Sequence, residues 1–141
     1  ALGADGVWTG SIWLTVRESD TSEPLKEKML AATSSDTVRS RSMTGKPARQ
    51  LRTPWTEAWD GPESPGTLPM PLQFMLTAEA QSRMHRAALA GTKPAADLAP
   101  SPVGQIVGSM NTVRSARDVV FDMVEEFVAT TERLSSLLPK E

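Results

Sequence analysis

The sequence predicts part of a larger α/β protein, with one short buried strand near the N-terminus and a mainly helical remainder. Val7-Trp8 lies between two glycine-containing turns, and a strand this short and apolar is typical of a parallel sheet that is buried on both faces. Apolar residues recur at helical spacing in residues 23–32, 72–90 and 115–138. Because a lone buried strand would leave its backbone groups unpaired, we expect neighbouring strands that this chain does not supply.

The N-terminal stretch, residues 1–14, is interpreted as a helix end, a turn, the strand and a phosphate-type loop. Gly3 suits a left-handed cap at the end of a helix, and Asp5-Gly6 supplies the turn. Gly10-Ser11 follows the strand directly. The order of these features predicts that the carboxyl end of the strand opens into a glycine-containing loop.

The middle of the chain is predicted to be more irregular. A helix is expected from Glu23 to Ala32, because Pro24 suits a first turn. Residues 36–43 alternate in the manner of a strand, and residues 44–49 end it. Residues 52–71 contain many prolines and no period, so we expect a long loop, whose tryptophans should pack on another part of the protein.

The C-terminal half contains the clearest helices. Residues 72–90 predict a helix whose apolar stripe consists of Leu72, Met75, Leu76, Ala80, Met84 and Ala87. Residues 91–102 are expected to form a linker, and residues 103–108 a short apolar run between glycines. Residues 115–138 predict the longest helix, with Ser115 at its start.

Composition narrows the classes of function. The net charge of −2 gives no reason to expect nucleic acid as a partner. No apolar run approaches the ~20 residues that span a bilayer, so no membrane is expected. The chain has no cysteine, which excludes disulfides and thiolate chemistry and fits a reducing compartment. A cytoplasmic protein that acts on a small molecule agrees best with these observations.

A first candidate site follows the predicted strand, at Trp8, Thr9, Gly10 and Ser11. A glycine allows a phosphate to approach the main chain, and the serine hydroxyl adds a hydrogen bond. The alternative is an ordinary tight turn between a strand and a helix. On these residues alone, the two interpretations stay open.

A second candidate site is Gly45-Lys46-Pro47-Ala48-Arg49. The surrounding segment, residues 36–53, carries one carboxylate, Asp36, and five cations: Arg39, Arg41, Lys46, Arg49 and Arg52. These cations could dock a phosphorylated ligand such as the nucleotide end of coenzyme A. The alternative is a solvated loop in which Arg49 binds carbonyl groups inside the fold.

The third candidate is Gln105, which lies between Gly104 and Gly108 in an apolar setting. Its amide could bind a flavin edge or a substrate carbonyl, or it could bind nearby backbone. The only histidine, His85, lies on a predicted helix without a second ligand or triad partner. We therefore expect His85 to be structural or superficial, and we expect no metal site.

These motifs, in this order, resemble one known family. The run Leu2-Gly3-Ala4-Asp5-Gly6-Val7-Trp8-Thr9-Gly10-Ser11 resembles the eighth barrel strand of the nitronate monooxygenase (2-nitropropane dioxygenase-like) family. Thr44-Gly45-Lys46-Pro47-Ala48-Arg49 resembles the Ser/Thr-Gly-(Lys/Arg)-Pro-Ala-Arg segment of that family, and Gly104-Gln105 with Gly108 resembles its Gly-Gln-x-x-Gly element. The resemblance covers nearly the whole chain and is weakest in residues 53–71.

The resemblance implies an FMN-binding α/β fold of which this chain is the C-terminal part. Residues 1–35 would end a TIM (β/α)8 barrel, with its last strand and phosphate loop, and residues 36–141 would form a mainly helical C-terminal segment packed on that barrel. Gly10 and Ser11 would hold the FMN phosphate, with Thr9 and Trp8 beside it, and Gln105 and Lys46 would contact flavin or substrate. The catalytic base of the family lies upstream, so no catalytic residue is expected here and the chain alone should be inactive.

The substrate stays open at this stage. The family implies an FMN-dependent oxidoreductase that oxidises alkyl nitronates with oxygen. Relatives on the same fold act on acyl-CoA or enoyl thioesters in lipid or steroid breakdown, and the basic residues 36–53 favour that alternative. A third alternative, from another class, is a non-catalytic helical interaction module, in which the long last helix pairs with a second chain. If the protein is an enzyme, a homodimer is also possible.

Overall fold

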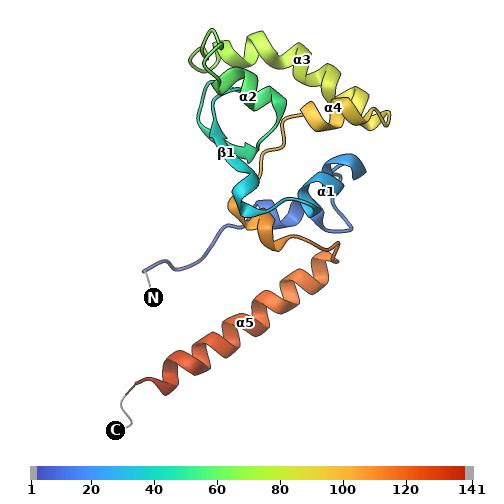
Figure 1. Ribbon diagram of the computed structural model, residues 1–141. Coiled ribbons are helices and arrows are strands. Elements are labelled where there is room, and N and C mark those ends of the chain that lie inside the picture. The colour runs from blue at the N-terminus through green and yellow to red at the C-terminus, as the bar shows by residue number, and fades with distance from the viewer. Residues whose placement is uncertain (1–2, 139–141) are drawn as a thin grey trace.

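The computed structural model describes residues 3–138 of the 141-residue chain. In chain order the elements are η1 (Ser11–Thr15), α1 (Glu23–Leu30), η2 (Ser34–Asp36), β1 (Thr37–Ser40), β2 (Ala48–Leu51), α2 (Pro54–Asp60), α3 (Leu72–Leu89), α4 (Lys93–Leu98), η3 (Gln105–Ser109) and α5 (Ala116–Ser136), where η denotes a 3-10 helix. Figure 1 shows a body that contains α1 to α4, from which the N-terminal segment and α5 project as two arms.

The centre of the body is a small apolar core. Buried side chains from α1, β2, η3 and the residues that flank η3 meet there: Met29, Leu51, Val103, Val107 and Met110. The backbone supports this arrangement, since the N–H of Leu51 donates to the carbonyl of Ser101 at 3.0 Å and the N–H of Val103 donates to the carbonyl of Arg49 at 3.2 Å. The core therefore joins segments that are up to about 80 residues apart in sequence around one short hairpin.

The hairpin confirms the strand that was expected in residues 36–43. β1 and β2 pair antiparallel, with Arg39 opposite Arg49. The second strand was not predicted, because residues 44–49 were interpreted only as a break. Its four residues, Ala48–Leu51, include no β-branched or aromatic side chain, so its strand conformation comes from pairing and burial and not from local propensity.

Two short helices occupy segments that were predicted to be irregular. The loop prediction for residues 52–71 is wrong at α2, which Thr53 and Thr56 begin by exchanging hydrogen bonds between their backbone N–H groups and side-chain oxygens. The linker prediction for residues 91–102 is wrong at α4. There, the ammonium of Lys28 donates to the carbonyls of Ala96, Asp97 and Ala99 at 3.0–3.2 Å. A cap from a residue so distant in sequence leaves no local signal.

Helix α3 confirms the prediction for residues 72–90, but the face that it buries is not the apolar stripe. The buried residues of α3 are Gln73, Thr77 and Ala88, whereas Leu72, Met75 and Leu76 are exposed. Gln73 and Thr77 face the turn between β1 and β2 and donate to its carbonyls, whereas Ala88 packs against Ala95 and Ala96 of α4. Trp55 and Trp59, which were expected to pack on another part of the protein, are both partly buried and lie beside each other, with ring centroids 6.0 Å apart.

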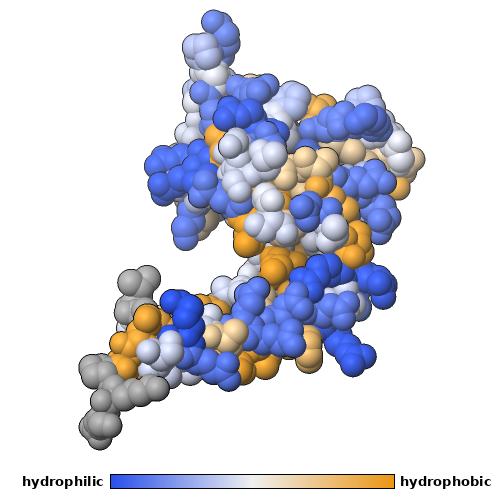
Figure 2. Space-filling model, turned by 60° about the horizontal axis from the view of Figure 1, so that its bottom comes forward, coloured by the Kyte–Doolittle hydropathy of each residue, from blue (hydrophilic) through white to orange (hydrophobic). Residues whose placement is uncertain are grey.

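Helix α5 confirms the last predicted helix. The hydroxyl of Ser115 accepts a hydrogen bond from the N–H of Asp118 at 3.0 Å, which caps the first turn. Val119 is its one buried residue, and the exposed apolar residues of the helix include Val120, Phe121, Val124, Phe127, Val128 and Leu134. Figure 2 shows apolar side chains exposed along this arm, and a hollow between the arm and the body.

The predicted buried strand at Val7-Trp8 is not present. These residues form no strand, and their exposed fractions are 88% and 101%. The physical reason is that no other strand of the described residues lies beside them, so the backbone has nothing to pair with. Gly3 has a φ of +82°, as a left-handed cap requires, but the helix that it was expected to end lies outside the described residues.

Candidate functional site

The turn after the expected strand lies against the Gly-Gln element, although the two are distant in sequence. The N–H of Gly104 donates to the hydroxyl oxygen of Ser11 at 2.8 Å, across 93 residues. The approach is close, since a Cβ on Gly104 would lie 3.3 Å from that oxygen. The structure thus brings together the first and third candidate sites that the sequence indicated.

The Gly10-Ser11 turn presents unpaired backbone donors. The 3-10 helix η1 begins at Ser11, and the N–H of Trp13 donates to the carbonyl of Gly10 at 3.2 Å. Within residues 3–138, the N–H groups of Ser11 and Ile12 donate no hydrogen bond. A Cβ added at Gly10 would meet nothing within 4 Å, so an anion could approach this backbone freely.

Thr9, the residue before the turn, is held in place by hydrogen bonds from Trp13. The indole Nε1 of Trp13 donates to both the carbonyl oxygen and the hydroxyl of Thr9, each at 3.1 Å. Trp8, by contrast, is fully exposed. Of the four residues predicted around the phosphate, Thr9 and Ser11 are therefore held by the body, Gly10 is open, and Trp8 projects into solvent.

Gln105 is exposed, and its backbone is supported by η2. The hydroxyl of Ser34 donates to the carbonyl of Gln105 at 2.8 Å. Gly108 is also pressed against Ser34, because an added Cβ would lie 2.8 Å from the Ser34 N–H nitrogen. Sequence reasoning missed Ser34, although it explains why Gly108 has no side chain.

A capping box holds Ser34 in place. The carboxylate of Asp36 accepts from the N–H of Thr33 at 2.7 Å and from its hydroxyl at 2.8 Å. These hydrogen bonds lower the pKa of Asp36 below its ordinary value of 3.8. The Thr-Ser-Ser-Asp pattern of residues 33–36 is the signal that could have predicted this turn.

Lys46 does not join this cluster. It is exposed in the turn between β1 and β2. Ser34 and Gln105 lie at the other end of β1, where η2 contacts η3. All five cations of residues 36–53 are exposed. Arg49 donates to the hydroxyl of Thr37 at 3.0 Å, not to carbonyl groups as one interpretation expected. The exposure agrees with a solvated basic surface.

Other candidate chemistry is sparse. His85 is exposed on α3, as expected. Across residues 3–138, no cluster of histidine and carboxylate side chains could hold a metal ion. No helix in the same range has the length and apolar character to cross a membrane.

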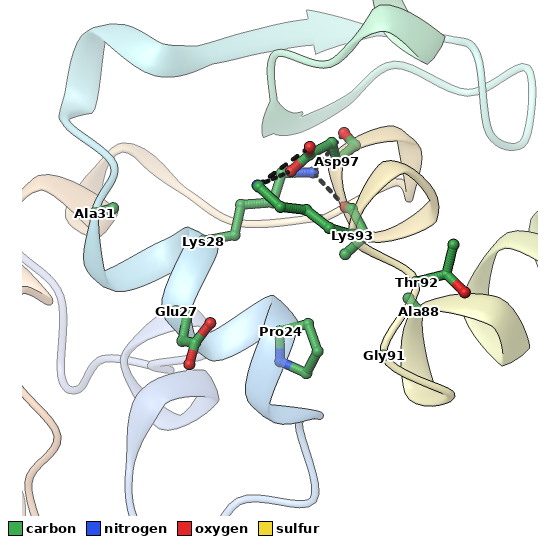
Figure 3. Close-up of a pocket in the computed structure, with 10 residues that line it drawn as sticks. Pro24, Glu27, Lys28, Ala31, Ala88, Gly91, Thr92, Lys93 and Asp97 are labelled. Atoms are coloured by element: carbon green, nitrogen blue, oxygen red, sulfur yellow. Dashed lines mark hydrogen bonds and ion pairs between the residues drawn. The ribbon is translucent and has the colours of Figure 1, made fainter.

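A partly open cleft of about 400 Å³ lies between α1 and the end of α3 with α4 (Figure 3). Its floor is formed by alanines and Pro24, and its cations are already paired: Lys28 with the α4 carbonyls, and Lys93 with Asp97 at 3.1 Å. Burial lowers the pKa of Lys28. Neither Ser11 nor Gln105 lines the cleft. Its two lysines, Lys28 and Lys93, bind groups of α4.

The Gly10-Ser11 turn, with its open backbone donors and its hydroxyl, is thus held against the distant Gly104-Gln105 element in a chain of mixed helices and strands. The family model for nitronate monooxygenase matches residues 1–126. The chain belongs to the nitronate monooxygenase family.

The relatives extend well beyond the chain. A Mycobacterium tuberculosis protein named as a monooxygenase is 57% identical over 140 residues, which is 99% of this chain and 37% of the relative. A Bacillus subtilis protein named as a nitronate monooxygenase is 40% identical over 76 residues, covering 54% of this chain and 22% of the relative. This chain spans only about a third of the length of its first relative.

Two solved structures agree with this assignment. FabK of Thermotoga maritima and a point mutant of it superpose with TM-scores of 0.61 and 0.65, at 26% and 27% identity. The superpositions cover 89% and 96% of this chain and 37% of each FabK chain. The arrangement of the arms and body therefore recurs in a solved relative.

Proposed function

We propose that this chain acts as part of a longer FMN-dependent oxidoreductase, in which residues 1–35 end a (β/α)8 barrel and residues 36–141 pack on it. Family membership supports this proposal. The observation that carries it is the junction of Ser11 with Gly104, which places a hydroxyl and open backbone donors at one point. In such an enzyme the flavin supplies the redox chemistry, and the protein orients it and the substrate.

The residues of the turn fit a phosphate. Gly10 leaves space for an anion, and the N–H groups of Ser11 and Ile12 are donors without partners among residues 3–138. Because the Ser11 oxygen accepts from the N–H of Gly104, its own O–H proton is directed elsewhere and can be donated to a phosphate oxygen. Gln105, exposed next to Gly104, would contact the flavin or the substrate.

The turn can be tested in the longer protein. Gly10→Val should weaken FMN binding by about tenfold or more, because loss of a charge-assisted hydrogen bond costs roughly 1.5–3 kcal/mol. Titration of the apoprotein with FMN measures the effect. Ser11→Ala should also weaken binding, whereas Ser11→Thr, which keeps the hydroxyl, should not. Unchanged FMN affinity in a folded Gly10→Val variant would show that this turn does not bind phosphate.

The proposed substrate is an alkyl nitronate, which fits the family. A second candidate, an acyl-CoA or enoyl thioester, is favoured by the exposure of Lys46 and the neighbouring arginines. Coenzyme A carries several phosphates, and an exposed cationic surface attracts them with a strength that salt reduces. A small nitronate needs no such surface.

The two substrates predict different effects of the same change. If the basic surface docks coenzyme A, Lys46→Ala with Arg52→Ala should raise KM for an acyl-CoA several-fold at low salt, and less at high salt. Flavin content should not change. If the substrate is a nitronate, steady-state kinetics should show almost no effect. A working acyl-CoA reaction that ignores both substitutions would remove the argument for coenzyme A.

A further inference from the structure

A chain of hydrogen bonds joins the arginine of the Gly45–Arg49 motif to the Gly-Gln element. The guanidinium of Arg49 donates to the hydroxyl of Thr37 at 3.0 Å. That hydroxyl donates to the carbonyl of Ser34, also at 3.0 Å. The hydroxyl of Ser34 then donates to the carbonyl of Gln105 at 2.8 Å. Ser34 therefore lies between two motifs that are far apart in the sequence.

The Gly-Gln element also contacts the proposed phosphate turn. Gly104, the residue before Gln105, donates its N–H to the hydroxyl oxygen of Ser11 at 2.8 Å. A hydrogen bond of this kind is lost when donor and acceptor are more than about 3.5 Å apart. A displacement of Gly104 by roughly 1 Å would therefore break it. The Ser11 contact depends on how closely η3 is held.

Ser34 meets η3 at both ends of one helical turn. Its hydroxyl binds the carbonyl of Gln105, the first residue of η3. Gly108 follows three residues later and lies against the same serine, because an added Cβ would collide with the Ser34 hydroxyl and would lie 2.8 Å from the Ser34 nitrogen. A 3-10 helix has about three residues per turn, so Gln105 and Gly108 share the face of η3 that lies on Ser34.

Ser34 is itself fixed from both sides. The Thr33–Asp36 capping box holds the turn that contains it. On the other side, Thr37 has one hydroxyl proton, and its oxygen accepts from the cation of Arg49. That proton is thus directed to the Ser34 carbonyl. Charge-assisted hydrogen bonds are about twice as strong as neutral ones, so Arg49 strengthens the hold on Ser34.

We propose that Ser34 is a positioning residue for the flavin phosphate. It holds η3 where the N–H of Gly104 binds the Ser11 oxygen, which leaves the Ser11 proton for a phosphate oxygen. This inference rests on the proposed function, since it concerns the phosphate of the same flavin. In this assignment Ser34 acts through Gly104 and Ser11, and Arg49 serves phosphate binding indirectly, by orienting Thr37.

The test compares two flavins on the longer protein. The apoprotein is titrated with FMN and with riboflavin, and the ratio of the two affinities isolates the contribution of the phosphate. Ser34→Ala should lower this ratio by about threefold to tenfold, because the Ser11 hydroxyl loses its fixed orientation. Riboflavin affinity should stay the same. A general loss of structure would instead weaken both flavins and leave the ratio unchanged, which would overturn the proposal.

Ser35→Ala is the matched control. Ser35 is the neighbouring serine of η2, is equally exposed, and takes no part in the hydrogen bonds described above. Its substitution should leave the ratio unchanged, and an equal loss there would overturn the proposal.

Gly108→Ala tests the same contact without removing a hydroxyl. The added methyl group should push η3 away from Ser34, so the ratio of FMN to riboflavin affinity should fall here as well. This variant decides the matter if Ser34→Ala does not fold. A folded Gly108→Ala protein with the parent ratio would contradict the proposed role of the contact.

A double variant shows whether Ser34 acts through Ser11. Ser11→Ala alone should lower the ratio, and adding Ser34→Ala should lower it little further, because both changes remove the same interaction. Fully additive effects would overturn the proposal. A parent protein that binds riboflavin as tightly as FMN would contradict the proposed function itself. A parent that prefers FMN, with a Ser34→Ala variant that keeps the full preference, would contradict only this inference.

Discussion

The body and the two arms of this chain differ in what holds them. In the body, residues 11–114, even polar side chains such as Gln50 and Gln73 are fully buried. In the arms, residues 3–10 and α5, large apolar side chains such as Trp8 and Phe127 are exposed. The body therefore has buried cores of its own, although the start of α3 also exposes apolar side chains, whereas the arms bury almost nothing against the described residues. This chain matches 37% of each solved FabK chain, so most of FabK has no counterpart among the residues described here.

The largest effect is expected on the last helix. Phe127 is 72% exposed here, and we propose that the barrel covers it in the longer protein. Phe127→Asp should then destabilise the longer protein by about 3 kcal/mol or more, because it removes a buried ring and buries a charge. In the 141-residue chain, the same change should alter stability by less than about 0.5 kcal/mol. Urea unfolding of both proteins measures the difference.

Leu51→Ala is the matching change in the body. Leu51 is buried in the core with Met29 and Val107, so its truncation should cost about 2–4 kcal/mol in both proteins. If Phe127→Asp were as damaging as Leu51→Ala in the short chain, α5 would be packed within that chain, and the contrast between body and arms would be false.

A smaller effect concerns Asp36, which supports Gln105 through Ser34. Hydrogen bonds from Thr33 lower the pKa of Asp36 in the folded protein. Its stabilisation is therefore complete at pH values above the ordinary pKa of 3.8 and is lost as the pH falls through the lowered value. Asp36→Asn should melt at a slightly lower temperature than the parent at neutral pH, and at the same temperature in strong acid.

Melting curves of both proteins from neutral to acid pH test this point. The substitution removes the titrating group and keeps a side chain of similar size. A difference in melting temperature that persists at a pH well below the folded pKa would mean that the charge of Asp36 is not what stabilises the turn.

The sequence predicted the helices whose apolar period continues over several turns. The helices α1, α3 and α5 were recognised from their period, and the start of α5 was recognised from Ser115. The Gly10-Ser11 turn and the Gly-Gln element were singled out as candidate sites. What the sequence could not show was that Ser11 and Gly104 touch, because a contact across 93 residues depends on the whole fold.

The errors have physical causes as well. Apolar periodicity usually marks the buried face of a helix, but in α3 the stripe residues Leu72, Met75 and Leu76 are exposed. Here the carbonyls of Ser42 and Met43 attract the polar face of the helix, through Gln73, Thr77 and Gln81. The Val7-Trp8 strand was expected to be buried because its composition suits a sheet. A strand there would need neighbouring strands, which the described residues do not supply, and residues 3–10 adopt no regular structure.

Flavin binding by the longer protein tests the central claim most directly. After gel filtration, the visible absorbance per chain should show one flavin in the longer protein and none tightly held by the 141-residue chain. Titration of the apoprotein should give tighter binding of FMN than of riboflavin, which lacks the phosphate that Gly10 and Ser11 are proposed to hold. A longer protein that binds no flavin, or that binds riboflavin as tightly as FMN, would contradict the account.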